Sequence, residues 1–308
     1  MVGEPSTLLE AIRFFSEPET CVKYLAERRW PEGPVCPACG GKDHYYLSTR
    51  FLWKCKGCTK QFSVKVGTIF EDSPVSLDKW LPAVWMLTSD KNGISSMELQ
   101  RAIKVTQKTA WFMLHRIRKA MQTGTFNKMV GQVEVDETFV GGKARNMHRH
   151  IRAQKIKGTG GMGKAIVVGL LERKGHVRVK VAQSTRRKPL HDFVKEHVTP
   201  GSEVFSDALK SYEGLAAEFT HKVVDHAEAY VEGQVHTNGL ENFWSLLKRS
   251  IYGTYIAVEP YHLHRYVDEQ AFRYNHRKDV DGDKGRFQTV LRQACGKRLT
   301  YKEMVGKE

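Results

Sequence analysis

The sequence predicts an α/β (α+β) chain in which a metal-binding ribbon and a helical region precede a mixed-sheet domain. Three observations lead to this prediction: paired cysteines between residues 36 and 58, helical periodicity from 76 to 124, and alternating β-branched strands from 133 onward. With 308 residues, the chain is long enough for two or three folded units. The expected division is 1–73 (N-terminal helix plus ribbon), 74–128 (helical domain), 129–280 (mixed-sheet domain) and 281–308 (tail with a short helix).

Basic residues exceed acidic residues along most of the chain. Lysine and arginine number 49 against 34 aspartates and glutamates, which gives a formal net charge of +15. This excess predicts nucleic acid as the partner, with an anionic membrane as the weaker alternative. No apolar run approaches the ~18 residues that would span a bilayer, and the N-terminus lacks the pattern of an export signal. We therefore expect an unexported, cytoplasmic protein that does not enter a membrane.

Four of the six cysteines form two Cys-x-x-Cys pairs with fifteen residues between the pairs. Two such pairs at this separation predict a tetrahedral zinc site within a ribbon of short strands. Because protein thiolates fill all four positions, we expect the zinc to be structural. A thioredoxin-like redox pair is the alternative, but the surrounding sequence lacks the βαβ pattern that it requires. The four expected ligands are Cys36, Cys39, Cys55 and Cys58.

The remainder of the N-terminal half has helical periodicity. One helix is expected over residues 7–29, and Ser76 is expected to cap another that Asn92-Gly93 ends. Ser95 or Ser96 then opens a short helix and Thr106 caps a longer one, which is the layout of a helix-turn-helix. An ordinary helical bundle has the same periodicity. In the helix-turn-helix interpretation, the second helix presents three residues to a DNA major groove, namely Gln107, Lys108 and Thr109.

Strand patterns dominate the next domain. The order strand, strand, strand, helix, strand, helix, strand, helix is that of an RNase H-like fold, a mixed sheet with helices on both faces. The basic segment 146–163 is expected as a mobile loop. Strands are expected at 133–142, 165–172, 176–181, 203–207 and 221–224, and helices at 189–198, 212–219, 238–252 and 261–275.

Three acidic residues occupy positions that converge in this fold. Asp136 lies on the first strand, Asp207 ends the fourth, and Glu241 lies on the helix after the fifth. Each taken alone could be a solvated surface acid, whereas together they suit a two-metal phosphodiester site with Mg²⁺. Lys248 is two helical turns beyond Glu241 on the same helix face, where it can meet a DNA phosphate.

The two glutamates beside Asp136 are expected to have no catalytic role. If the strand alternates, Glu137 faces away from Asp136, and Glu134 is also expected to lie out of register with it.

Several long motifs together resemble the IS1595-family (ISXO2-like) insertion-sequence transposases. The ribbon and helical region match that family too, so the resemblance covers nearly the whole chain. It implies a DDE-type transposase that binds element ends on double-stranded DNA, cuts there and joins 3′-hydroxyls to target DNA with magnesium or manganese. It also implies a homo-oligomer in the prokaryotic cytoplasm, associated with the nucleoid. The matching runs are 133–143, 206–208, 236–249, 252–255 and 272–278.

The resemblance assigns residue roles. Asp136 and Asp207 match the first two metal ligands. Family members vary between glutamate and asparagine at the third, and this chain offers both Glu241 and Asn238. We prefer Glu241, because a carboxylate binds the cation better and Lys248 follows at the spacing of the wider DDE group. Lys248 and Arg249 are expected to contact DNA.

Two other functions fit parts of the pattern. The chain could be a zinc-ribbon and helix-turn-helix DNA-binding regulator with an inactive RNase H-like domain, or a structure-selective nuclease on the same fold. A pure regulator has no use for three carboxylates at these places.

Overall fold

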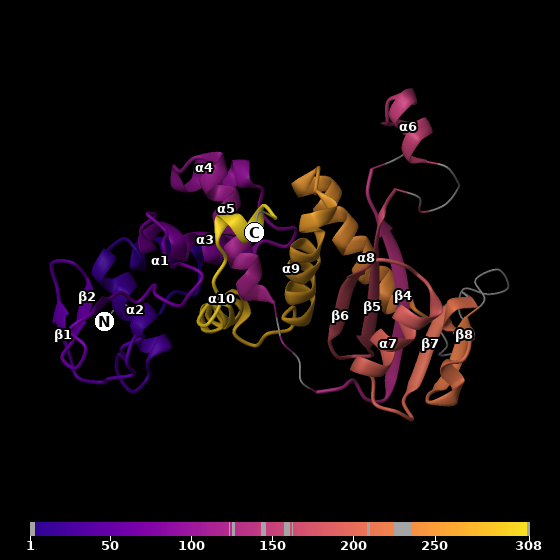
Figure 1. Cartoon of the computed structure of the whole chain (residues 1–308), viewed down its shortest axis with the longest axis horizontal. Helices are drawn as coiled ribbons and strands as arrows, with labels where there is room; N and C mark the ends of the chain where they lie inside the picture. The colour runs from indigo at the N-terminus through magenta and orange to yellow at the C-terminus, as the bar shows by residue number, and fades with distance from the viewer. Residues whose placement is uncertain are drawn as a thin grey trace. The chain divides into compact units, whose positions relative to one another are not determined.

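The computed structural model describes residues 4–122, 124, 127–142, 146–156, 161, 163–207, 210–224 and 236–306. The chain forms two compact units (Figure 1). Unit 1 consists of Met1–Thr123 with His276–Glu308, and unit 2 is Gly124–Asn275. Residues 281–308, expected as a separate tail, therefore belong to unit 1. Among the described helices, none is both long and apolar enough to cross a bilayer.

Unit 1 begins with two helices and a small sheet. Strands β1 (His44–Leu47), β2 (Leu52–Cys55) and β3 (Gln61–Phe62) pair in sequence order as an antiparallel ribbon. The buried ring of Trp53 lies 5.4 Å from that of Trp30 and 6.0 Å from that of Phe62. This aromatic packing joins the ribbon to the end of the preceding helix.

Two helices, α1 (Leu8–Phe14) and α2 (Pro18–Arg29), replace the single helix expected over 7–29. The break has a local cause. A residue before proline avoids helical backbone angles, and Glu17 is accordingly extended at ψ 121° while Pro18 begins the new helix.

Helices of both chain ends form the rest of unit 1. Phe287 lies between Phe15 and Trp85, at centroid distances of 5.8 and 4.8 Å, so the C-terminal segment completes the core. The helices are α3 (Leu77–Ser89), α4 (Ser96–Ile103), α5 (Gln107–Met121), α10 (Gly282–Gln293) and α11 (Tyr301–Met304).

The α4–α5 pair has the expected helix-turn-helix layout. Ser95 and Glu98 form a capping box at the start of α4, which satisfies free N–H groups of its first turn. Lys104 ends α4 in the left-handed conformation, at φ 50°, and Thr106 caps α5 by accepting the Thr109 N–H.

Unit 2 contains a five-stranded mixed sheet of order β6-β5-β4-β7-β8. Central strand β4 pairs antiparallel with β5 and parallel with β7, and β7 pairs parallel with β8. This order confirms the predicted fold class, a mixed sheet consistent with an RNase H-like domain. The strands are β4 (Gln132–Val140), β5 (Ala165–Glu172), β6 (Val177–Ala182), β7 (Glu203–Asp207) and β8 (Thr220–Val224).

Each face of the sheet buries a separate hydrophobic cluster. Val133 and Val135 of β4 pack with α7 (Arg187–His197) on one face. On the other, Val167 and Leu171 of β5 pack with α8 (Asn238–Arg249) and α9 (Leu263–Asn275). Alternate residues of a strand point to opposite faces, so β4 presents Glu134 and Asp136 to the α8 side.

Three segments of unit 2 differ from expectation. Within 146–163, expected as a loop, Arg149–Lys155 form helix α6, which projects beyond the sheet (Figure 1); residues 157–160 and 162 lie outside the described chain. The helix expected over 212–219 is two 3₁₀ turns, η2 (Lys210–Tyr212) and η3 (Leu215–Ala217), because Gly214 at φ 93° interrupts it.

The third difference follows α8. The helix expected to reach residue 252 ends at Arg249 and continues as a π-helical turn, η4 (Ser250–Tyr255). A short 3₁₀ turn, η5 (Pro260–His262), then precedes α9.

Candidate active site and metal centre

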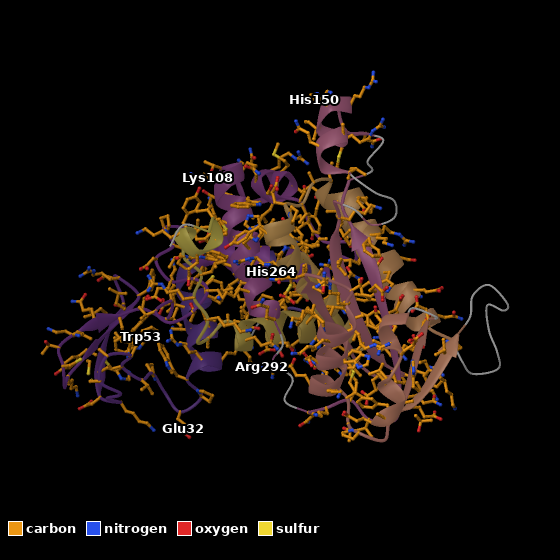
Figure 2. The ribbon with its side chains drawn as sticks, turned by 45° about the vertical axis from the view of Figure 1, so that its right-hand side comes forward. Glu32, Trp53, Lys108, His150, His264 and Arg292 are labelled. Carbon is orange, nitrogen blue, oxygen red and sulfur yellow. The ribbon has the colours of Figure 1, made fainter. Side chains whose placement is uncertain are left out.

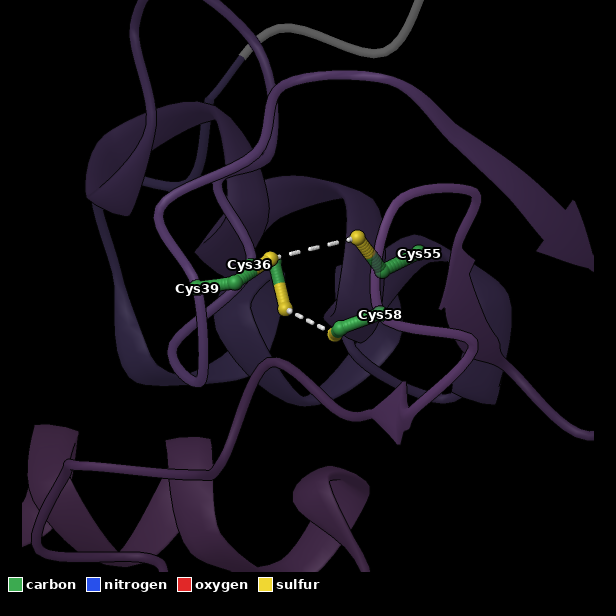
Figure 3. Close-up of side chains that lie close together, drawn as sticks. All are labelled: Cys36, Cys39, Cys55 and Cys58. Carbon is green, nitrogen blue, oxygen red and sulfur yellow. Dashed lines mark hydrogen bonds between the residues drawn. The ribbon is translucent and has the colours of Figure 1, made fainter.

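The four predicted zinc ligands lie together at one end of the ribbon (Figure 3). Their sulfur atoms all lie within 4.8 Å of one another, with Cys36 Sγ 3.6 Å from Cys58 Sγ and Cys39 Sγ 3.5 Å from Cys55 Sγ. Thiolates around a tetrahedral zinc at 2.3 Å are about 3.8 Å apart, so the geometry fits. The cysteines thus form the ligand set of a structural zinc site.

The first two predicted acids lie on neighbouring parallel strands. Strands β4 and β7 pair in parallel as far as Glu134 opposite Phe205, and Asp136 and Asp207 each follow this last pair by two residues. Asp207 is close enough to Asp136 to raise its pKa by repulsion. Residues opposite each other in a sheet point to the same face. Both acids therefore lie near the carboxyl end of β7, where binding sites occur in parallel sheets.

Asp136 is held by two hydrogen bonds. The indole Nε1–H of Trp244 donates to Oδ2 at 2.9 Å, and the backbone N–H of Glu137 donates to Oδ1 at 2.8 Å. Gly169 lies directly opposite Asp136 on β5, and a Cβ there would be 2.8 Å from the Trp244 ring. The missing side chain of Gly169 makes room for the indole that orients the carboxylate.

Burial and like charge destabilise the ionised acids at this site. Burial raises the pKa of Asp136 to about 7, and repulsion by Glu137 and Asp207 adds to the shift, while its two hydrogen bonds oppose it. Burial likewise raises the pKa of Glu137; a 2.7 Å hydrogen bond from Tyr212 opposes the rise and Asp207 adds to it. A cation near Asp136 would favour the ionised form of each group.

Glu134 has a structural role that sequence reasoning missed. It shares the face of Asp136, and its buried carboxylate pairs with Arg173 at 3.1 Å and accepts the Leu240 N–H at 3.0 Å. Arg173 also donates to the His236 carbonyl at 2.7 Å. A Cβ on Gly239 would lie 2.7 Å from Glu134 Oε2, so glycine permits this approach. The available signal was the i, i+2 spacing from Asp136.

These contacts hold α8 alongside β4 in the same direction. Glu134 meets Leu240, Asp136 meets Trp244, and Gly141 meets Tyr252, whose hydroxyl donates to the Gly141 carbonyl at 3.1 Å. Glu241 therefore lies on α8 between two residues that are hydrogen-bonded to β4, Leu240 before it and Trp244 after it.

The residues predicted along α8 lie in different surroundings. Glu241 and Asn238 are both exposed and one helical turn apart, so the choice of third ligand stays a prediction. Lys248 is half-buried and Arg249 exposed.

The acids are less tightly gathered than the cysteines. Across the described parts of the chain, the cysteines are the one group of three or more potential ligands whose ligating atoms all lie within 4.8 Å of one another. The acids thus offer a strand-borne pair, Asp136 and Asp207, with Glu241 on the adjacent helix. This suits Mg²⁺, which binds through one or two carboxylates together with substrate phosphate.

The three residues predicted to enter a DNA groove begin α5 in unit 1. Gln107 and Lys108 are exposed, and Lys108 lies at the surface of the unit (Figure 2). Thr109 is half-buried, and its hydroxyl is 2.8 Å from that of Thr106. Gln107 and Lys108 are therefore the more accessible of the three.

Comparison with known proteins extends over both units. Residues 128–275 match the ISXO2-like transposase domain, and residues 16–61 match the transposase zinc-ribbon domain. A protein in transposable element ISH50 of Halobacterium salinarum is 29% identical over 253 residues, covering 77% of this chain and 84% of the relative. A transposase-like protein of Haemophilus influenzae is 29% identical over 96 residues, covering 31% of this chain and 77% of the relative.

Proposed function

Because this chain belongs to the ISXO2-like (IS1595) family of insertion-sequence transposases, we propose that it binds element ends and catalyses metal-dependent strand cleavage and 3′-OH strand transfer. The supporting observation is the parallel pairing of β4 with β7, beyond whose last pair, Glu134 and Phe205, Asp136 and Asp207 each follow by two residues in a mixed sheet. Double-stranded DNA is the substrate in this proposal, both as element end and as target.

The candidate ligands for Mg²⁺ or Mn²⁺ are Asp136, Asp207 and Glu241, with Asn238 as the alternative third ligand. Hard carboxylate oxygens suit these ions, and a cation would favour the ionised form of Asp136, whose pKa is raised chiefly by burial and further by repulsion from Glu137 and Asp207. When bound, the ions would activate the attacking oxygen and stabilise the negative charge on the leaving oxygen.

The protein groups orient the reactants. Trp244 and the Glu137 N–H fix the Asp136 carboxylate, and Glu134 fixes the start of α8. In this proposal Lys248 contacts a DNA phosphate. In unit 1, Gln107, Lys108 and Thr109 would contact the element end, while Arg249 would add a phosphate contact in unit 2. Transposition joins two ends, so a homo-oligomer at the nucleoid is part of the proposal.

A strand-transfer assay tests this function. The DNA flanking the coding sequence supplies the element ends, a supercoiled plasmid supplies the target, and Mg²⁺ starts the reaction. We expect joined products from the wild-type protein, and a loss on the order of 10³-fold for Asp136→Ala and Asp207→Asn, since ligand loss removes several kcal/mol of charge stabilisation. End binding by both variants should remain.

The products distinguish the other candidates. Cut ends without joining would identify a nuclease, and tight binding without metal-dependent cleavage would identify a regulator. An Asp136→Ala protein with full activity would refute the assignment of Asp136.

A further inference from the structure

A pocket of about 770 Å³ opens in unit 2 beyond the candidate active site. We call it the β4-end pocket, because the end of β4, the start of β5, η4 and the turn before α9 form it. Val140 at its wall lies on the same face of β4 as Asp136 and four residues farther on, roughly 13 Å along an extended strand. The pocket therefore lies farther along β4 than Asp136.

The backbone around the β4-end pocket has two uncommon features. The segment Ser250–Tyr255 is π-helical, a rare conformation that is frequent at functional sites. Ile256 then adopts φ 61°, which is strained for a β-branched residue, with a cost of order 1 kcal/mol or more. Both features lie in one stretch of pocket wall, which also carries exposed apolar side chains.

Two of those side chains are poorly covered. Ile256 is 71% exposed and Tyr252 is 47% exposed, although both are large and apolar. Tyr252 is also fixed, because its hydroxyl donates to the Gly141 carbonyl and accepts the Gly141 N–H at 3.3 Å. A fixed aromatic ring beside an apolar side chain is the kind of surface on which nucleic-acid bases stack.

Positive charge accompanies this apolar wall. Lys164 and Lys248 both line the pocket, with Asn146 adding an amide and Glu259 a single carboxylate. Lysine beside an apolar and aromatic surface matches the two halves of a nucleotide, its phosphate and its base.

We propose that the β4-end pocket binds one unpaired nucleotide of the DNA strand at Asp136, with its base against Tyr252 and Ile256 and its phosphate beside Lys164 and Lys248. An extruded nucleotide would hold the strand open next to the reacting phosphate. The inference rests on the proposed function for the identity of the strand. The geometry of the pocket is independent of the carboxylates.

Binding of two short single strands to the full-length protein tests the pocket. One is a fluorescein-labelled thymidine oligonucleotide, and the other is an abasic deoxyribose-phosphate strand of the same length and charge. Stacking on the pocket should make the thymidine strand bind on the order of tenfold more tightly. Tyr252→Ala and Ile256→Ala should each remove most of this difference. Tyr261→Ala is the matched control, since Tyr261 is 54% exposed in the same unit but does not line the pocket.

Photocrosslinking locates the contact. A 5-iodouracil oligonucleotide should crosslink to Tyr252, which peptide mapping identifies. Crosslinks confined to unit 1, or equal binding of thymidine and abasic strands, would overturn the proposal. Because Ile256 is largely exposed, Ile256→Ala should leave the core intact. This variant can therefore test the pocket even if Tyr252→Ala misfolds. Neither probe contains the element sequence, so these binding tests do not depend on the strand-transfer assay. The proposed function can therefore fail while the pocket still binds a nucleotide, and the reverse.

Discussion

The zinc ribbon and the acidic site are built in opposite ways. The four cysteines come from two turns within one short stretch of unit 1, and their sulfurs all lie within 4.8 Å. The acids of unit 2 come from β4, β7 and α8, and Asp136 and Asp207 come near each other only when the sheet forms. The four cysteines form a closed metal site, and the ribbon around them needs the metal to fold. The acidic site is instead held in place by contacts within the protein.

This difference separates what each metal does. Zinc replaces a hydrophobic core in a ribbon too small to have one of its own. At the acids, Trp244, Arg173 and Gly169 prepare positions before any cation binds. We therefore expect zinc to control folding and Mg²⁺ to control chemistry.

Zinc removal should produce the largest effect. Structural zinc contributes on the order of 10 kcal/mol to folding of small domains, so Cys55→Ala or a zinc-selective chelator should unfold the ribbon and abolish element-end binding. Fluorescence of the buried Trp53 reports the unfolding, and the thermal transition of unit 2 should remain. Cys295→Ala, outside the ribbon, is the control and should keep its zinc. Normal end binding by zinc-free protein would show that the ribbon has no role in recognition.

Breaking the Glu134–Arg173 pair should have the next largest effect. Glu134 is buried, at 2% exposure, and Arg173 is partly buried, at 15%, so Arg173→Met leaves the buried Glu134 carboxylate without its arginine and should cost about 3–5 kcal/mol in chemical denaturation. The double variant Glu134→Gln/Arg173→Met should regain much of that stability, because the amide can still accept the Leu240 N–H. Strand transfer should recover with it if Glu134 acts by positioning α8.

The exposed pair Arg187–Glu213 is the matched control. Its side chains are 57% and 65% exposed, and Arg187→Met should cost less than about 1 kcal/mol. Equal losses in the two pairs would contradict a special role for Glu134.

The zinc ligands and the succession of strands along the chain could be predicted, because each depends on a local sequence pattern. Two Cys-x-x-Cys pairs and alternating β-branched residues are visible in a short window. The same holds for the caps at Ser95 and Thr106, which the structure confirms.

Features that depend on contacts between distant segments could not be predicted. The roles of Gly169 and Gly239 exist only because α8 lies against the sheet. The expectation that Glu134 lies out of register with Asp136 was wrong, because residues two apart on a strand share a face. Its partner Arg173, which follows a different strand, could not be predicted from the local pattern. The packing of Phe287 into the N-terminal core likewise joins the two ends of the chain.

The last prediction tests whether burying the ionised carboxylate of Asp136 lowers the stability of unit 2. Burial raises the pKa of Asp136 to about 7, above its ordinary value of 3.8, so the folded protein holds that proton more tightly. The contribution of Asp136 to stability is therefore most favourable below about pH 4 and becomes unfavourable as the pH rises to about 7 and above. In Mg²⁺-free buffer at pH 8, ionising the buried Asp136 carboxylate costs about 4 kcal/mol of stability. Asp136→Asn removes this cost but loses one hydrogen bond, worth about 1 kcal/mol, so it should raise the free energy of unfolding of unit 2 by about 3 kcal/mol.

The gain should shrink as the pH approaches 4, and Mg²⁺ should stabilise the wild-type protein but not the variant. Asp192→Asn, at an exposed position of α7, should change stability by less than about 0.5 kcal/mol. Chemical denaturation between pH 4 and pH 8 measures the free energy of unfolding of the wild-type protein and of both variants. A wild-type protein as stable as Asp136→Asn at pH 8 would mean that the carboxylate is already compensated by protein groups, and the acidic site would then resemble the closed zinc site.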